Sequence, residues 1–313
     1  MSAGTDEEHL TREQVGRMFE TLSNWGRWGE DDDLGTLNLI TAEHRRRAAA
    51  LVREGRAVSL GRAISPTFAV DNPWPALHHM IESGAGAHEG FVGMTDWFGL
   101  ACHGFAVTHL DGLNHAAWNG KMYNGRAASS VTTRHGGRAG AVGRAGARIA
   151  TRGLLVDVPA LRGLPWLDLG DRVRPGDLDA WEAWSGIRVD AGDALVISTG
   201  RDSRRRERGA HDFWKEGSPG LDASCLPWLR ERDVAVLVSD TGQDAMPSGY
   251  PDIPTPVHGV GIVAMGLWLL DNAGLDELLD VCREHGVWEF LLCCAPLDVK
   301  GATGSPVTPV AII

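Results

Sequence analysis

Histidine and aspartate are concentrated in the segment THLDGLNH, residues 108–115, which follows a further histidine, His103. Imidazole nitrogens and carboxylate oxygens are the usual ligands of Zn²⁺ or Mn²⁺ where no thiolate is close. His109 and Asp111 are two residues apart, so an extended chain would point both side chains to one face, about 7 Å apart. A pair at this spacing is weak evidence, but His103 and His115 strengthen the prediction of a metal site.

The alternative is that these side chains only hydrogen-bond the backbone of a loop. That interpretation explains less easily why four ionisable groups lie on an otherwise apolar segment, because buried polar groups need partners. If residues 102–111 form a strand, His103, Phe105, Val107, His109 and Asp111 share one of its faces.

The elements around this segment alternate between predicted helices and strands, which indicates an α/β fold with a mixed sheet. Helices are predicted at 10–25, from a cap at Thr41 to Gly55, at 174–186, from near His258 and from about Leu275. Strands are predicted at 57–64, 102–111, 153–158, 193–199, 234–240 and 288–299. The stretch 71–95 has no periodicity and is expected to be a long loop, a feature often found near functional sites.

Composition excludes several classes of protein. The net charge of −11 argues against a nucleic-acid binder, which would present a basic face. No apolar run reaches the length of a membrane span, and the acidic, polar beginning of the chain is unlike a signal peptide. The five cysteines lack CxxC spacing, which favours a cytoplasmic protein without disulfides. The motif G-x-S-x-G is missing, so a serine hydrolase is disfavoured.

The segment 108–115 resembles the signature H-x-G-T-H-x-D-x-P-x-H of the cyclase and metal-dependent hydrolase family that includes bacterial kynurenine formamidases. Five further stretches resemble the longer members of that family, in the same order along nearly the whole chain. They are NWGRWGEDDDLGTLNLITAEH, GDALVISTGR, VAVLVSDTGQDAMP, VHGVGIVAMGLWLLDNAGLDEL and APLDVKGATGSPVTPVAII. The resemblance implies a swivelling β/β/α-type fold with a barrel-like mixed sheet and flanking helices, in one domain over 1–313. Residues 1–40 would be an extension that packs on the core or on a partner subunit.

The resemblance also implies a role for each site residue. His109 and Asp111 would be metal ligands and His115 the acid/base near the scissile bond. A second ion, where present, would share Asp111 and add His258 and Asp271. We expect one divalent ion, Zn²⁺ or Mn²⁺, with two possible.

Two departures from the family pattern bear on this ligand set. The first signature histidine falls at Phe105, which cannot bind a metal, and His103 could replace it if a bulge at Gly104 brings it into reach. The downstream glutamate is Asp271, which is one methylene shorter. Asn114 also precedes the last histidine without the signature proline.

Aromatic and polar residues near the signature are candidates for contact with substrate. They are Trp25, Trp28, Trp97, Tyr123 and Asn124, and Trp118 could line the same pocket. Each could instead be core, turn or subunit interface.

The resemblance implies a hydrolase of a small amide, formamide or lactone, aromatic or cyclic, acting as a homodimer or homotetramer on a small-molecule substrate. The alternatives are a cyclase or dehydratase that uses the same metal and base, and a metal-free binding or scaffold protein.

Overall fold

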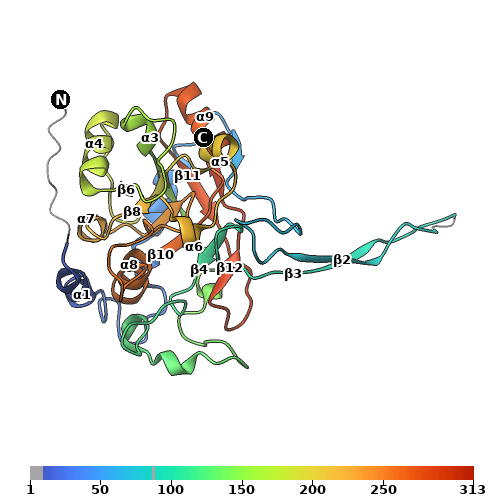
Figure 1. Ribbon diagram of the computed structural model, residues 1–313, viewed down its shortest axis with the longest axis horizontal. Helices are drawn as coiled ribbons and strands as arrows, with labels where there is room; N and C mark the ends of the chain where they lie inside the picture. Colours follow the sequence, from blue (N-terminus) through green and yellow to red (C-terminus); the bar gives the residue numbers. More distant parts are fainter. Residues whose placement is uncertain (1–9, 87–88) are drawn as a thin grey trace.

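The computed structural model describes residues 10–86 and 89–313, and its centre is a nine-stranded mixed sheet (Figure 1). In spatial order the strands are β1 (Ala57–Ser59), β13 (Val310–Ile312), β11 (Glu289–Cys294), β5 (Ile149–Asp157), β7 (Ala194–Ser198), β9 (Val236–Ser239), β10 (Trp268–Asp271), β4 (His109–Asp111) and β12 (Gly304–Pro306). The sheet curls into a half-barrel with flanking helices, so the predicted α/β class and mixed sheet are confirmed.

Parallel pairing is confined to the centre of the sheet, where β5, β7, β9 and β10 lie side by side. The pairs that β4, β11 and β13 form are antiparallel. Strands β7 and β9 are buried along their whole length. Their continuous apolar sequences follow from this, because elements cover both faces of a parallel sheet.

Helices surround the sheet (Figure 1). They are α1 (Arg12–Thr21), α2 (Ala42–Ala49), α3 (Val158–Leu161), α4 (Pro175–Ser185), α5 (Arg201–Arg208), α6 (Phe213–Glu216), α7 (Cys225–Glu231), α8 (Pro256–His258) and α9 (Asp276–His285). A π-helix, Gly259–Met265, continues α8, and short 3₁₀ turns occur at Gly35–Leu39, Tyr123–Gly125, Ala128–Ser130 and Val142–Ala145. Within the described residues, none of the helices combines the length and hydropathy that a membrane crossing requires.

The described part of the expected N-terminal extension, residues 10–40, packs on the body, while residues 1–9 lie outside the described residues. Thr11 caps α1 through a capping box with Gln14. Further along, the indole of Trp268 donates to the carbonyl of Leu34 at 2.7 Å. The hydrogen bond of Trp268 joins the extension to strand β10, which lies next to β4.

Three local predictions were wrong. Thr41 caps α2 as expected, but the helix ends at Ala49 rather than Gly55. The stretch 71–95 is not one long loop, because it contains β2 (Leu77–Glu82) and the start of β3 (Thr95–Gly99), which pair as an antiparallel hairpin. Between the helices predicted from near His258 and from about Leu275, the structure has a strand that was not predicted, β10, which ends at Asp271.

The segment 102–111 is extended only at its end. Only His109–Asp111 forms a strand, and the chain bends over 103–107, where Gly104 has φ +122°. A side chain is strained at that φ, so glycine suits the bend. The predicted single face of five residues is therefore wrong, although the bend is at the glycine expected to permit one.

The β2–β3 hairpin projects far from the rest of the molecule (Figure 1). We call it the arm and define it as residues 77–86 and 89–99 among those described. Both strands are exposed over nearly their whole length, including the large apolar side chains of Ile81 and Phe98. A pair of small strands, β6 (Arg172–Val173) and β8 (Gly220–Leu221), lies elsewhere on the body.

Candidate metal centre

Strand β4 brings the signature residues to the middle of a three-stranded layer. It pairs with β10 on one side, where His109 is opposite Asp271, and with β12 on the other, where Asp111 is opposite Gly304. His109, Asp111 and Asp271 are all buried. The pairing of β4 with β10 thus joins residues more than 150 positions apart in the chain.

Two groups of metal-competent atoms meet at this point. The first consists of His103, His109 and Asp111, and the second of Asp111, His258 and Asp271, with the ligand atoms of each group within 4.8 Å of one another. In the first group, Oδ1 of Asp111 lies 3.0 Å from Nδ1 of His103 and 3.5 Å from Nε2 of His109.

The second group uses the other oxygen of the same carboxylate. Oδ2 of Asp111 lies 3.5 Å from Nε2 of His258, and that nitrogen is 3.3 Å from Oδ2 of Asp271. His109 Nε2 lies 3.9 Å from the same Asp271 oxygen. Asp111 therefore lies between the two groups and faces each with one oxygen.

Each histidine of the two groups is oriented by a contact of its other ring nitrogen. Nδ1 of His109 donates to the carbonyl of Val107 at 2.9 Å, which leaves Nε2 facing the cluster. Nδ1 of His258 is 2.6 Å from Asp244, and Nε2 of His103 is 3.1 Å from the hydroxyl of Thr303. Such outer contacts fix the ring and tautomer of metal-ligating histidines.

Asp111 lacks the partners that a buried carboxylate needs. Among the residues that the structure describes, neither of its oxygens accepts a hydrogen bond of acceptable geometry, and Nδ1 of His103 is likewise unpartnered. Burial would raise the pKa of Asp111, but the surrounding histidines, His115 and His103 first, outweigh it and hold that pKa below its usual range. A buried anion without hydrogen bonds is costly unless a cation compensates it, so this donor set fits a divalent metal ion.

The electrostatics of His103 and His258 agree with a site built around carboxylates. Burial disfavours the charged form of His103, yet its contact with Asp111 outweighs this and raises the pKa to about 10. Burial likewise opposes protonation of His258, but Asp271 and Asp244 raise its pKa well above the ordinary value. Both shifts have the same cause, which is the carboxylates next to each ring.

His115 has the opposite environment. Its ring stacks on that of His103, with centroids 3.9 Å apart, and forms an edge contact with His258 at 6.2 Å. Burial lowers the pKa of His115 to about 4, since the attraction of Asp111 is offset by repulsion from neighbouring histidines. The ring is therefore neutral at pH 7 and can accept a proton.

A cavity of about 590 Å³ opens over the cluster. His103, His109, His115, His258 and Asp271 all line it. Its other walls include Phe19 and Trp118, whose rings stack at 4.3 Å, and Phe105 and Trp214, which meet edge to face at 5.4 Å. A cavity of this size, with convergent polar groups at its base, is suited to a small ligand.

Of the aromatic and polar residues predicted to contact substrate, Trp118 lines this cavity and the others lie outside it. The indole of Trp25 donates to Val263, Trp28 lies under Arg27, and the hydroxyl of Tyr123 donates to Asp32. The amide of Asn124 donates to the carbonyls of Gly29 and Glu30, and Trp97 lies on the arm. None of Trp25, Trp28, Trp97, Tyr123 and Asn124 is among the described residues that line the cavity.

Several residues that the sequence reasoning missed support the cluster. Asp244 accepts from the backbone N–H groups of Val257 and His258 as well as from the His258 ring. The amide of Gln243 donates to Asp271 at 2.9 Å. Both residues belong to the stretch VAVLVSDTGQDAMP, which resembles the family. That resemblance is the sequence feature that could have pointed to them. Gly304 is needed as well, because a Cβ there would come within 2.4 Å of the His103 ring.

Comparison with known families gives one match by sequence. The model of the family described as "Putative cyclase" matches residues 58–243, which is more than half of the chain. A search of the curated proteins finds no match.

Solved structures match over most of the chain. A crystal structure described as a novel cyclase superimposes with a TM-score of 0.85 at 28% identity, covering 94% of this chain and 99% of that one. Isatin hydrolase A from Ralstonia solanacearum matches with a TM-score of 0.59 at 20% identity, covering 82% and 91% of the two chains. Isatin hydrolase A from Labrenzia aggregata, bound to benzyl benzoate, matches with 0.60 at 20%, covering 85% and 95%. At these last identities the likeness concerns the fold.

Proposed function

The chain belongs to the cyclase family, and from this premise we propose that it is a metal-dependent hydrolase of a small amide, formamide or lactone with a flat ring. The observation that carries the proposal is the buried carboxylate of Asp111, which lacks hydrogen bonds and has imidazole nitrogens on both sides. Hydrolases with the same fold, the isatin hydrolases, support the assignment to this class of enzyme.

In this proposal one ion is held by His103, His109 and Asp111. When bound there, a divalent metal ion such as Zn²⁺ or Mn²⁺ polarises a carbonyl and lowers the pKa of water from 15.7 towards about 7. Asp111, His258 and Asp271 could hold a second ion, because their ligand atoms also lie within 4.8 Å of one another. His103 would then take the place of the signature histidine that is Phe105 in this chain.

His115 is the group that would move protons. It is neutral at pH 7 because burial lowers its pKa to about 4, and it faces the cavity beside the metal ligands. In this role it accepts the proton of the attacking water and then donates it to the leaving nitrogen or oxygen, which general acid–base catalysis requires.

The aromatic walls of the cavity support a flat substrate. Phe19 and Trp118 form one wall, and Phe105 and Trp214 form another. Aromatic side chains favour stacked or edge contacts with a ring. A ring held between these walls would have its carbonyl directed to the histidines at the base.

The decisive experiment is an assay of metal-loaded protein against a panel of cyclic amides, lactones and N-formyl aromatic amines. Activity that is lost on chelation and restored by Zn²⁺ or Mn²⁺ would support the proposal, with ring opening and ring closure distinguished by following the reaction in both directions. The substitution His109→Gln should abolish metal retention and turnover together. Protein that binds no divalent metal and hydrolyses nothing in the panel would instead indicate a binding protein.

We also propose that the chain self-associates through the arm. A two-stranded hairpin is marginally stable alone in water, and exposed apolar patches of this kind mark association surfaces. Eight large apolar side chains of the arm are exposed: Leu77, Met80, Ile81, Phe91, Val92, Met94, Trp97 and Phe98. A second copy of the chain is the occupant that the family resemblance implies.

A further inference from the structure

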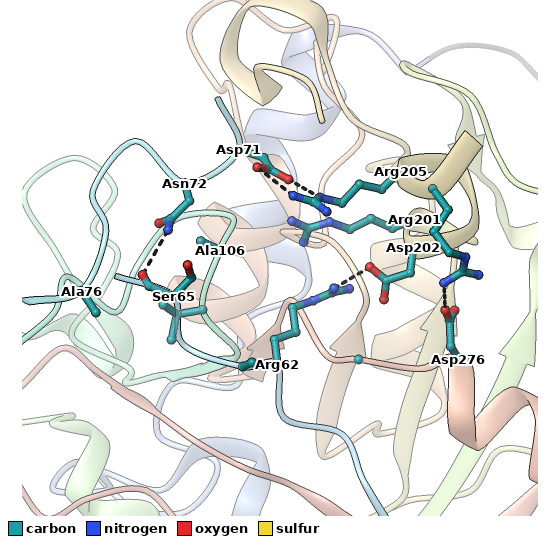
Figure 2. A pocket seen from close by; sticks show the side chains of 14 residues that line it. Arg62, Ser65, Asp71, Asn72, Ala76, Ala106, Arg201, Asp202, Arg205 and Asp276 are labelled. Atoms are coloured by element: carbon teal, nitrogen blue, oxygen red, sulfur yellow. Dashed lines mark hydrogen bonds and ion pairs between the residues drawn. The ribbon is translucent and has the colours of Figure 1, made fainter. Parts of the chain in front are cut away.

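A second cavity has a volume of about 510 Å³, and Figure 2 shows the side chains that line it. The segment 104–107 separates the two cavities, since Gly104 and Phe105 line the metal cavity while Ala106 and Val107 line the second. We call this second cavity the arginine cavity, because four arginines line it: Arg62, Arg201, Arg205 and Arg206. Nothing in the proposed hydrolysis uses these residues.

Three of these arginines are neutralised by aspartates of the cavity wall. Arg62 lies 2.5 Å from Asp202, Arg205 lies 2.6 Å from Asp71, and Arg206 is paired with Asp276. The dashed lines in Figure 2 mark these pairs. The wall thus holds four arginines but only three carboxylates.

Arg201 is the arginine without such a pair. It is only 6% exposed, and its guanidinium donates to the carbonyl of Asp240, to the side-chain oxygen of Asn272 and to the carbonyl of Phe105. Among the described residues, none offers it a carboxylate within ion-pairing distance. Burial and the neighbouring Arg62 lower the pKa of Arg201 to about 9, although Asp202, Asp240 and Asp71 act in the opposite direction.

Asp240 lies close to Arg201 but outside the cavity. Its carboxylate accepts from the backbone N–H groups of Thr199, Gly200 and Arg201 at the start of α5, and it does not line the cavity. Those N–H groups and the helix dipole already stabilise that anion. Among the residues that line the arginine cavity, arginines therefore outnumber carboxylates by one, and Arg201 is the arginine without a carboxylate partner there.

We propose that the arginine cavity binds a small organic monocarboxylate, with its carboxylate on Arg201 and Arg205. The three acceptors hold the Arg201 guanidinium in place before a ligand arrives, and Arg205 keeps unpaired N–H donors because only Nε and one terminal nitrogen contact Asp71. Guanidinium groups bind carboxylates through paired N–H donors.

The remaining wall favours an apolar body over a phosphate. Ala63, Ala76, Ala106 and Val107 line the cavity beside the arginines. These side chains suit a small hydrocarbon or aromatic group. A phosphate would leave this apolar wall without contact.

The test is calorimetric titration of the intact, metal-loaded protein with sodium benzoate, with benzamide as its neutral counterpart. Benzoate is expected to bind at least tenfold more tightly than benzamide, and equally well after the metal is removed. Equal affinities for the two compounds would overturn the proposal, and so would loss of benzoate binding on chelation, because that would assign the binding to the metal centre. Inorganic phosphate that binds more tightly than benzoate would overturn the choice of a monocarboxylate.

Variants at several positions keep the test decisive even if the protein with the buried Arg201→Gln substitution does not fold. Arg201→Gln and Arg205→Gln should each weaken benzoate binding at least tenfold, and Asp71→Asn should tighten it several-fold because it removes a competing carboxylate. Arg208→Gln is the matched control, since Arg208 lies on the same helix but outside the cavity. Unchanged affinity in both Arg205→Gln and Asp71→Asn, or an equal loss in Arg208→Gln, would refute the site.

Discussion

The carboxylate of Asp244 lies 2.6 Å from Nδ1 of His258, and the opposite nitrogen of that ring faces Asp111 and Asp271. We predict that Asp244→Asn weakens metal binding to the group that contains His258 by about 10–100-fold, because outer contacts of this kind orient the ligand. Metal titration by calorimetry measures the loss. Asp252→Asn is the control, since Asp252 lines the cavity but pairs with Arg12. Unchanged affinity in Asp244→Asn would mean that the contact does not position the ring.

Substitution of His115 should lower catalysis without removing the metal, unlike substitution of a metal ligand. We predict that His115→Gln lowers kcat by about 10²–10⁴-fold while metal content stays unchanged, because a positioned acid/base contributes that much. Metal analysis and steady-state kinetics on the same preparation decide this. A variant that loses its metal together with its activity would make His115 a ligand instead.

Metal binding should release a proton from His103. The pKa of this ring in the metal-free protein is raised to about 10, so it is protonated at all lower pH values, and a metal ion must displace that proton. Affinity should therefore rise by about tenfold per pH unit between pH 7 and 9. Calorimetry in buffers of different ionisation enthalpy counts the protons. His103→Gln should release one fewer, and an unchanged count would exclude His103 as a ligand.

Trp214 should select for flat substrates. It lines the metal cavity and meets Phe105 edge to face. We predict that Trp214→Ala raises KM for an aromatic substrate by about tenfold, consistent with about 0.5–1.5 kcal/mol for the aromatic contact beyond the area it buries. KM for an aliphatic lactone should change much less. Trp184→Ala, on the exposed face of α4, is the control, and equal effects on both substrates would argue against stacking.

The arm should determine the oligomeric state. We predict that the double substitution Ile81→Glu and Phe98→Glu converts the oligomer to a monomer without unfolding the body, because both side chains are exposed on the projecting hairpin. Light scattering coupled to size-exclusion chromatography measures the mass. The control is Trp184→Glu, which adds a charge at another exposed aromatic position. A wild-type chain that is already monomeric would contradict the proposal.

The sequence was informative where a pattern is local. The cap at Thr41 and the apolar strands at 194–198 and 236–239 depend on neighbouring residues, so they could be predicted. Strand β10 could not, because a short apolar run after a helix fits either a strand or a helix. The arm was missed because its strands bury no face and so show no regular alternation.

The residues of the site likewise differ in whether local sequence could predict their positions. His109 and Asp111 are two residues apart, and their convergence follows from strand geometry. Asp244 acts on His258 from 14 residues away across a turn, and a single sequence does not reveal that contact. The aromatic walls are harder still, because twelve tryptophans look alike until tertiary packing brings Trp118 and Trp214 to one cavity.

The C-terminal strands have a consequence for biosynthesis. Thr303 and Gly304 hold the His103 ring beside β4, and β13 fills the gap between β1 and β11. The sheet therefore cannot be complete before residue 312 has been translated, and His103 lacks its partners until residues 303 and 304 have been translated. Until then the nascent chain exposes histidines and carboxylates without their final geometry. The proposed metal site is thus expected to form only after these C-terminal strands have been synthesised.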